Sequence, residues 1–351
     1  MGVQLRAVCL AFAGSVGCAA IANADAVQDF YTGKQVSLII GSSVGGGYDS
    51  YARLVGRHFG KHIPGKPTIV VQNMPGAGSL NMTNYVYNVA PRDGSVLGAS
   101  QNSVAFEPLF HLLSPGGKTA RFDARKLNWI GSPTKEVYVP FVKSQSGVQV
   151  FGDLKKIPVR FGANERNTDN SLLALLLNKM FDTKIDVIHG YPGSSTALML
   201  AMERGEIDGL AGMSYGSLIG ISDHLLSEKK IRLLAQIGLG KHGDLPDVPL
   251  LLDLAESDED RAIMQALFAK YEMARPIFTA PDVPADRVAA LRAAFSAAAA
   301  DPAFIAEAKT QRLEVQPVRG QDIQDLVDRI YQMPDALVMK VRGAISDPTT
   351  K

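Results

Sequence analysis

Short apolar segments, each followed by an amphipathic segment, set the pattern of the first third of the chain. Residues 35–40 (QVSLII) and 68–73 (TIVVQN) are rich in β-branched side chains, as buried strands are. From about residue 48 to 59, and again over 81–89, apolar positions recur with the spacing of one helix face. Another strand is expected within 90–100 (APRDGSVLGAS). This order of elements predicts a parallel sheet with helices on both faces.

A second unit of the same kind begins near Ser132. Strand-like segments at 137–142 and 159–163 precede a long apolar helix over 171–181. The stretches IDVIHGYPGS and IDGLAGMSYGS each have the pattern of a strand followed by a glycine-rich turn. We expect the next strand, at 231–238, to lead the chain back to the first unit, and the remaining residues to be mainly helical.

The first 24 residues have the pattern of an export signal. An arginine precedes the apolar run AVCLAFAGSVGCAAIA, and residues 22–24 (ANA) form an A-x-A cleavage site. Plain cleavage fits better than lipid anchoring at Cys18, because the residues before Cys18 suit a lipoprotein poorly. Both cysteines, Cys9 and Cys18, lie in this segment, so the mature chain would have no disulfide, no thiolate metal site and no cysteine nucleophile. We expect a periplasmic protein.

Charge and histidine spacing exclude several other classes of function. The chain has 36 Lys and Arg against 35 Asp and Glu, a net charge of +1, with no basic cluster of the kind that binds nucleic acid. His58 and His62 have i,i+4 spacing, but they lie at a basic helix end, where such residues favour the dipole. We therefore expect no nucleic acid, no metal and no cofactor.

The stretch GSSVGGGYDS, residues 41–50, is the first candidate for a catalytic or binding motif. Its first five residues match the G-x-S-x-G nucleophile elbow, with Ser43 as nucleophile, and GMSYG matches the same pattern with Ser214. Ser43 has too little chain before it to supply the strands of an oxyanion hole, and no acid–histidine pair stands out after Ser214. An exported serine esterase using Ser214 or Ser43 remains the alternative function. Neither VGGGYDS nor PGAGSLN completes a nucleotide-binding motif.

An anion cradle fits the glycine-rich stretch better than a nucleophile does. Glycines 45–47 allow successive backbone N–H groups to point inward, and the helix that follows adds the positive end of its dipole. Ser42, Ser43 and Ser79 offer hydroxyl donors. The alternative is that these glycines serve only the close packing of strand and helix. Comparable turns at 75–79, 164–170 and 190–195 follow other strands, so several turns are expected to meet at one cleft.

These segments resemble the Bug/TctC family, the solute-binding proteins of tripartite tricarboxylate transporters. The stretches that carry the resemblance are VSLIIGSSVGGGYDSYARLV, TIVVQNMPGAGSLNMTNYVYNVAPRDGSVLG, GYPGSSTALMLAMERGEIDGL, LPDVPLLLDL and PADRVAALRAAFSAAAADPAF. They occur in the family's order and cover essentially the whole mature chain.

The resemblance implies an α/β, two-lobed periplasmic-binding-protein fold with a ligand cleft between the lobes and crossing hinge strands. Lobe 1 would comprise 25–131 and 241–351, and lobe 2 would comprise 132–240. A non-catalytic monomer is implied, which binds a dicarboxylate, tricarboxylate or aromatic carboxylate and delivers it to membrane permease subunits. The candidate ligand-binding residues are Ser42, Ser43, Gly45, Gly46, Gly47, Tyr48, Asp49, Gly78, Ser79, Gln101, Asn102, Asn164, Arg166, Thr168, Tyr191, Gly193, Ser194 and Ser195.

Four of these candidates carry two interpretations each. Tyr48 stands where the family commonly has a small residue, and it either caps the ligand or packs as a helix residue. Arg166 lies in NERNTDN, which departs from the family's pattern, and is either a partner for a distal carboxylate or a solvated loop residue. Asp49 fits a first-turn helix acid better than a ligand contact. Tyr191 lines the cleft or packs at the hinge.

Overall fold

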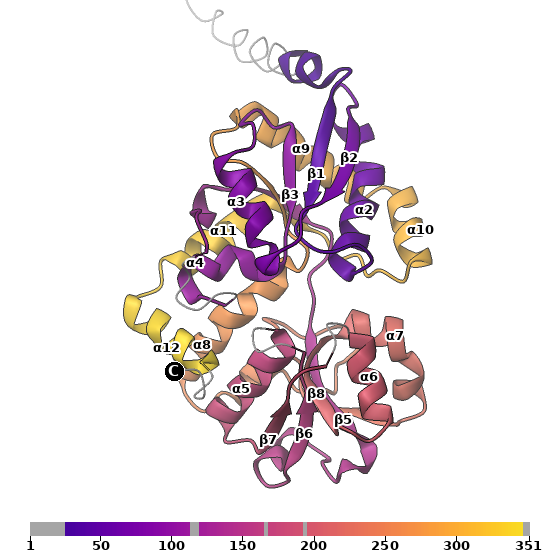
Figure 1. The fold of residues 1–351 in the computed structure, drawn as a ribbon, viewed down its shortest axis with the longest axis vertical. Coiled ribbons are helices and arrows are strands. Elements are labelled where there is room, and N and C mark those ends of the chain that lie inside the picture. The colour runs from indigo at the N-terminus through magenta and orange to yellow at the C-terminus, as the bar shows by residue number, and fades with distance from the viewer. Residues whose placement is uncertain (1–24, 113–118, 165–167, 192–194, 347–351) are drawn as a thin grey trace, which may run out of the picture.

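The protein has two lobes, each built on its own β-sheet (Figure 1). The computed structural model describes residues 25–112, 119–164, 168–191 and 195–346. The candidates Arg166, Gly193 and Ser194 therefore lie outside the described residues, as does the expected export signal. The strand order is β11-β4-β10-β3-β1-β2 in the first lobe and β7-β6-β8-β5-β9 in the second.

Three parallel strands form one half of the first sheet. They are β1 (Gln35–Ile40), β2 (Thr68–Asn73) and β3 (Val96–Ala99), with β1 in the middle. The helices α2 (Gly47–Phe59) and α3 (Leu80–Asn88) connect them. The strands at 35–40 and 68–73 were predicted to the residue, because their apolar β-branched runs end at turn-forming residues on both sides.

The other half of this sheet is antiparallel, which the sequence pattern did not predict. It contains β10 (Ile277–Thr279), β4 (Asn128–Ser132) and the short β11 (Val318–Arg319). β10 enters between β3 and β4 and runs antiparallel to both. The expectation of a parallel sheet is thus wrong for this half, because β10 comes from a distant part of the chain that no local strand–helix rhythm reveals.

The second lobe repeats the arrangement on a smaller scale. Its strands are β5 (Tyr138–Lys143), β6 (Val159–Gly162), β7 (Ile185–Ile188), β8 (Gly209–Ser214) and β9 (Ile231–Leu233). Its helices are α5 (Asp169–Phe181), α6 (Ser195–Glu203) and α7 (Tyr215–Ser227). β6 pairs in parallel with β7 and β8, whereas β5 is antiparallel to β8 and β9. The strand expected at 231–238 is shorter than predicted, and Ile237 only forms an isolated bridge with Tyr138.

Two segments that connect the lobes lie side by side. Residues 133–137 lead from β4 to β5, and residues 271–276 lead into β10. The N–H of Glu136 donates to the carbonyl of Tyr271 at 2.9 Å, and the N–H of Arg275 donates to Ser132 Oγ at 3.0 Å. We call these two segments the crossing segments. The lobe boundaries at 131/132 and 240/241 remain a prediction.

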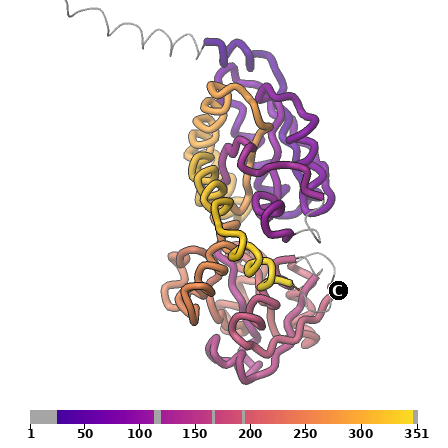
Figure 2. The backbone as a smooth tube through the Cα atoms, turned by 90° about the vertical axis from the view of Figure 1, so that its left-hand side faces the viewer, coloured from indigo at the N-terminus to yellow at the C-terminus, as the bar shows by residue number. Residues whose placement is uncertain are grey.

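The C-terminal part of the chain covers the first lobe and reaches the second. Its helices are α8 (Asp258–Phe268), α9 (Ala285–Ala299), α10 (Pro302–Thr310), α11 (Gly320–Tyr331) and α12 (Asp335–Ile345). Figure 2 shows the yellow C-terminal segment running from the first lobe onto the second. Arg342 of α12 donates to the Leu109 carbonyl in α4 (Glu107–Phe110) at 2.9 and 2.7 Å, and Lys179 of α5 donates to the Gly343 carbonyl. α12 therefore contacts both lobes.

Among the described residues, no single helix is both long and apolar enough to cross a membrane. α9 and α10 meet that test only as a pair, by length and composition, with a bend of 59° between them.

Candidate functional site

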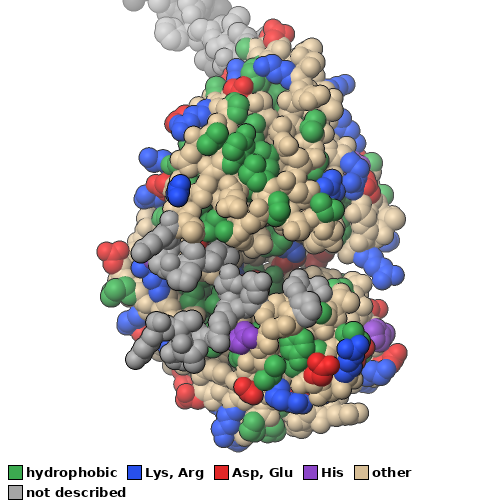
Figure 3. Space-filling model, viewed as in Figure 1, with side chains coloured by type: hydrophobic (Ala, Val, Ile, Leu, Met, Phe, Trp, Pro, Cys, Tyr) green, Lys and Arg blue, Asp and Glu red, His purple; other side chains and the backbone are tan. Residues whose placement is uncertain are grey.

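The carboxyl ends of β1, β2 and β3 meet on the side of the first lobe that faces the second. Figure 3 shows a hollow between the two lobes beside the residues drawn in grey. Ser79, which is wholly buried, lies where the strand ends meet: its Oγ donates to the Gly41 carbonyl at 3.0 Å and accepts from the Gln101 N–H at 3.1 Å. Gly78 and Ser79 both have positive φ, 62° and 78°. The Ser79 hydroxyl therefore connects the loops that follow β1, β2 and β3. Its direct contact with a ligand stays a prediction.

Asp49 holds the glycine loop in shape. Only 3% of this residue is exposed, and its carboxylate accepts from the Gly45 N–H at 3.0 Å, from Arg53 Nε at 3.0 Å and from Asn73 Nδ2 at 2.8 Å. Asn73 Nδ2 also donates to the Ser42 carbonyl at 2.9 Å. Burial alone would raise the pKa of Asp49, but the hydrogen bonds from Arg53, Gly45 and Asn73 outweigh it and lower that pKa. Through these hydrogen bonds the carboxylate connects the end of β2 to the glycine loop.

The glycines of this loop are exposed and are not needed for close packing. A Cβ at Gly45 or Gly46 would meet nothing within 4 Å, and Gly45 has φ +89°. Ser43, Val44 and glycines 45–47 are all exposed. The interpretation of Gly45 and Gly46 as a packing turn is therefore weakened, because nothing packs where their side chains would be.

The loop leads directly into an uncapped helix. α2 begins at Gly47, with Gly46 at its N-cap and no side-chain cap. The first N–H groups of a helix have no intrahelical partner, and they carry the positive end of the helix dipole. Ser42 Oγ is buried and has no hydrogen-bond partner within the described part of the chain. These groups together provide donors for an anion at the strand ends.

Tyr48 forms the wall of this site next to the crossing segments. Its hydroxyl accepts from the Asn102 N–H at 3.4 Å, and its ring lies 4.2 Å from the guanidinium carbon of Arg275. Burial raises the pKa of Tyr48 to about 12, so its phenol is neutral at physiological pH. Asn102 is 1% exposed, and its Nδ2 has no partner among the described residues. The structure thus brings Tyr48, Gln101 and Asn102 to the glycine loop.

Polar side chains also join the two loops of the second lobe. Asn164, at the end of β6, donates through Nδ2 to the Tyr191 carbonyl at 3.3 Å and accepts through Oδ1 from Asn170 at 2.8 Å. Thr168 Oγ1 donates to Asn170 Oδ1 at 2.6 Å, and the Gly190 N–H donates to the Asn164 carbonyl at 3.0 Å. Ser195 begins α6, directly after this loop. The predicted residues of the second lobe that the structure describes therefore lie at the carboxyl ends of β6 and β7.

Sequence reasoning missed Arg275, Glu136 and His189. Arg275 is 8% exposed and donates through Nη2 to Glu136 Oε1 at 2.6 Å. Neither residue lies in a glycine-rich turn, and only the crossing segments bring them to Tyr48. His189 follows β7, and its Nε2 lies 2.8 Å from Ser171 Oγ. A histidine directly after a predicted strand, in IDVIHG, was the available signal for this residue.

The described serine side chains do not form a nucleophile site. Ser214 is 4% exposed, and its Oγ caps α7 by accepting from the Ser217 N–H at 3.3 Å. Ser171 lies beside His189 but is wholly buried, so a substrate has no access to it. Within the described ranges, no histidine is hydrogen-bonded to Ser43 or Ser214. The same residues contain no cluster of His, Cys, Asp and Glu that would hold a metal.

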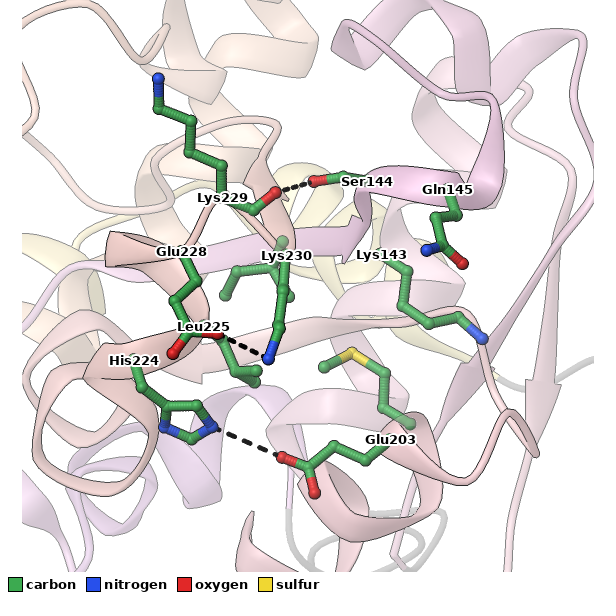
Figure 4. Close-up of a pocket in the computed structure, with 11 residues that line it drawn as sticks. Lys143, Ser144, Gln145, Glu203, His224, Leu225, Glu228, Lys229 and Lys230 are labelled. Carbon is green, nitrogen blue, oxygen red and sulfur yellow. Dashed lines mark hydrogen bonds and ion pairs between the residues drawn. The ribbon is translucent and has the colours of Figure 1, made fainter.

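The second lobe also has an open groove of about 690 Å³ at the opposite end of its sheet. Figure 4 shows its side chains, with Lys230 directed toward Glu228 and His224 toward Glu203. These pairs lie 2.6 and 3.7 Å apart. The groove is lined by Ile231 at the start of β9 and by Lys143 at the end of β5, which runs antiparallel to β8 and β9, so it lies at the amino-terminal edge of the parallel strands. Ligands of open α/β sheets bind at the other edge, so this groove is a poor candidate for the main site.

Comparison with solved structures identifies the fold. No protein-family model matches the chain, and no curated protein matches it in sequence. A TctC solute binding protein from Polaromonas is 16% identical, with a TM-score of 0.67 over 88% of this chain and 99% of that one. The periplasmic binding protein BugD is 16% identical, with a TM-score of 0.62 over 90% and 98%. A protein of R. palustris solved with adipate is 18% identical, with a TM-score of 0.61 over 89% and 97%.

These likenesses confirm the expected fold class. The chain has the α/β, two-lobed fold of periplasmic binding proteins, and the similar structures are binding proteins. The candidate site lies at the carboxyl ends of the parallel strands of the first lobe.

Proposed function

We propose that this protein is an extracytoplasmic solute-binding protein of the Bug/TctC type, which captures a small organic carboxylate for a tripartite tricarboxylate-type transporter. The observation that carries the proposal is the exposed glycine loop 45–47 in front of the uncapped N-terminus of α2. The likeness to TctC and BugD, and to a protein solved with adipate, supports the ligand class.

The hydrogen-bond donors at this loop are sufficient for micromolar binding of a carboxylate. A hydrogen bond to a charged group contributes about 1.5–3 kcal/mol, and micromolar binding corresponds to about 8 kcal/mol. Three to five donors from the α2 N-terminus, Ser42 and Asn102 therefore account for a micromolar carboxylate, before the cost of ordering is subtracted. The Gly45 N–H does not count among them, because it already donates to Asp49.

Closure of the lobes completes the site. A ligand held by the first lobe and touched by Asn164 or Tyr191 of the second favours the closed state, since only that state offers both sets of contacts. The crossing segments act as the hinge, with residues 133–137 leading into the second lobe and residues 271–276 leading back to the first. The protein works as a monomer in the periplasm after removal of residues 1–24, without catalysis, and passes its ligand to membrane permease subunits.

Thermal unfolding of residues 25–351 tests this proposal. The panel contains adipate, malate, citrate, benzoate and glutamate, and the protein is first stripped of co-purified ligand by refolding. A ligand at about one hundred times its Kd stabilises the folded state by about 2.7 kcal/mol, which raises Tm by several degrees. A panel that gives no shift would overturn the carboxylate proposal.

A pair of glycine variants shows whether binding depends on the loop. Gly46→Val places a side chain over the loop without a clash, because nothing lies within 4 Å of a Cβ at this position. We expect this variant to fold and to lose the ligand-induced shift. Gly152→Val is the matched control, since a Cβ there also meets open space, outside the loops of the site. The control should retain the full shift.

A further inference from the structure

A buried arginine lies against the glycine loop. Of Arg275 only 8% is exposed, and a Cβ built on Gly47 would lie 3.5 Å from its Nη2 atom. The guanidinium is therefore close to the residue where α2 begins. Its face packs on the ring of Tyr48 at 4.2 Å and reaches the ring of Tyr51 at 5.4 Å.

The guanidinium is fixed by contacts from several sides. Nη2 donates to Glu136 Oε1 at 2.6 Å, Nη1 donates to the Ala274 carbonyl at 3.0 Å, and the backbone N–H is bonded to Ser132 Oγ. Arg275 has no freedom to move away from the loop, because both crossing segments and α2 enclose it. A positive charge is thus held in place beside the N–H groups of the α2 N-terminus.

The guanidinium and its partner carboxylate each keep one buried atom without a hydrogen-bond partner in the part of the chain that is described. Glu136 is 8% exposed, and its Oε2 atom has no hydrogen-bond partner among the residues that the structure describes, and neither does Arg275 Nε. Burial raises the pKa of Glu136, and the adjacent Arg275 opposes that rise. A buried ion pair contributes little net stability compared with apolar residues of the same size, because both charges lose their hydration. Stability alone therefore does not explain an ion pair at this place.

We infer that Arg275 is the charge-selecting residue of the ligand site: its guanidinium, held under the glycine loop by Glu136 and Tyr48, makes the site prefer an ionised carboxylate over a neutral group of the same shape. This inference rests on the proposed function and adds to it the residue that supplies the charge. Main-chain N–H groups and hydroxyls donate to a carboxylate and to an amide oxygen, with stronger bonds to the carboxylate, and a fixed cation in a site of low polarity increases that preference further.

Calorimetric titration with adipate and malate, and with their neutral diamides, tests the inference. Wild-type protein is expected to bind the acids at least tenfold more tightly than the diamides. Arg275→Gln is expected to weaken the binding of the acids by about tenfold or more, a loss of about 1.4 kcal/mol or more, and to lower the acid-to-amide ratio by a similar factor. Arg275→Lys keeps the charge and is expected to retain a preference for the acids.

Two further variants keep the test decisive. Arg275→Gln leaves Glu136 buried without a partner, so the double variant Arg275→Gln with Glu136→Gln provides a neutral, hydrogen-bonding pair if the single variant fails to fold. Arg287→Gln is the matched control, because Arg287 also packs on a ring, that of Phe30 at 3.6 Å, and donates to a carbonyl, that of Asp93. It lies outside the site, and its variant is expected to bind as the wild type does.

The outcomes separate the two proposals. If wild-type protein binds the acids and the Gln variants keep the full preference for acids over amides, Arg275 is only a structural residue and the inference is overturned while the proposed function stands. Equal weakening of acids and amides in the Gln and Lys variants overturns the inference in the same way. If wild-type protein binds none of the panel, the proposed function fails, and the inference fails with it.

Discussion

Asp49 belongs to the candidate site, but its side chain contacts other residues of the protein and holds the glycine loop in place. Its carboxylate joins the loop at Gly45 to Arg53 on α2 and to Asn73 at the end of β2. The sequence pattern favoured a helix acid, which is correct for its position but does not predict these contacts. Asn73 lies at a strand end, and nothing in the spacing of the two residues shows that their side chains meet.

Replacing Asp49 by Asn should reduce stability in a pH-dependent way. Because the pKa of Asp49 is lowered in the folded state, its ionised form stabilises the protein above the ordinary Asp pKa of about 3.9, and this contribution disappears as pH falls through the lower folded value. We expect Asp49→Asn to lower the free energy of unfolding by about 1–2 kcal/mol at pH 7 and by less once the pH falls below the ordinary Asp pKa, as the wild-type carboxylate becomes protonated.

Urea unfolding at several pH values measures this difference. Asp186→Asn is the control, because Asp186 is exposed on β7. A difference between Asp49→Asn and wild type that does not shrink as the pH falls below about 3.9 would contradict the account of Asp49 as an ionised group that stabilises the loop.

Gly41 is constrained by Ser79 rather than by its own backbone. A Cβ at this position would lie 2.5 Å from both Cβ and Oγ of the buried Ser79. Gly41→Ala should therefore lower the free energy of unfolding by about 1–3 kcal/mol, the usual cost of overpacking, and loosen the contact between the three strand ends. Gly152→Ala, where the added Cβ meets open space, should change it by less than about 0.5 kcal/mol. Equal effects of the two substitutions would argue against the close contact.

At the scale of elements, regular segments with local signals were predictable and the connections between them were not. The strands at 35–40 and 68–73 have continuous β-branched runs, and α2 differs from its predicted start by one residue. The segment 231–238 is equally apolar, but its strand ends at Leu233. There the regular ladder is interrupted, although the Leu234 N–H donates to the Pro140 carbonyl and Ile237 exchanges two backbone hydrogen bonds with Tyr138.

A substitution in α12 tests whether this C-terminal helix restrains both lobes. Arg342→Met removes two hydrogen bonds to the Leu109 carbonyl and keeps an apolar stem of similar length. We expect a loss of about 1 kcal/mol in the free energy of unfolding and faster amide hydrogen exchange in α4 and α12. Arg329→Met on the exposed side of α11 is the control and should leave exchange in α4 unchanged. Unchanged exchange in both variants would mean that α12 does not restrain the first lobe.

At the scale of the whole molecule, the expected motion is a rotation of the two lobes about the crossing segments. If ligand binds between the lobes, saturating adipate should reduce the radius of gyration measured by small-angle X-ray scattering, because closure brings the lobes together. Gly46→Val should show no change with adipate, since its loop is blocked. A wild-type radius that stays constant although adipate raises Tm would place the ligand outside the hollow between the lobes.

The division into two units near Ser132 was accessible from the pattern of strands and helices, the cleft between two lobes came from the family resemblance, and the candidate site was accessible in part from local motifs. Glycines 45–47 and the turn before Ser79 carry visible signals, because such turns need residues that tolerate positive φ or close approach. Arg275 and Glu136 carry none. They reach Tyr48 only because two crossing segments lie side by side, and such long-range pairing leaves no periodic trace in the chain.

The position of β10 in the first sheet has a consequence for the nascent chain. β3 and β4 are joined only through Ile277–Thr279, and the other neighbour of β4 is β11, so a chain that has emerged from the ribosome as far as the second lobe has an open edge on β3 and no partner strand for β4. Such a chain cannot complete that sheet before its last third is synthesised, and it offers those strands to chaperones in the meantime. The same insertion therefore makes folding of the first lobe late, cooperative and dependent on the C-terminal residues.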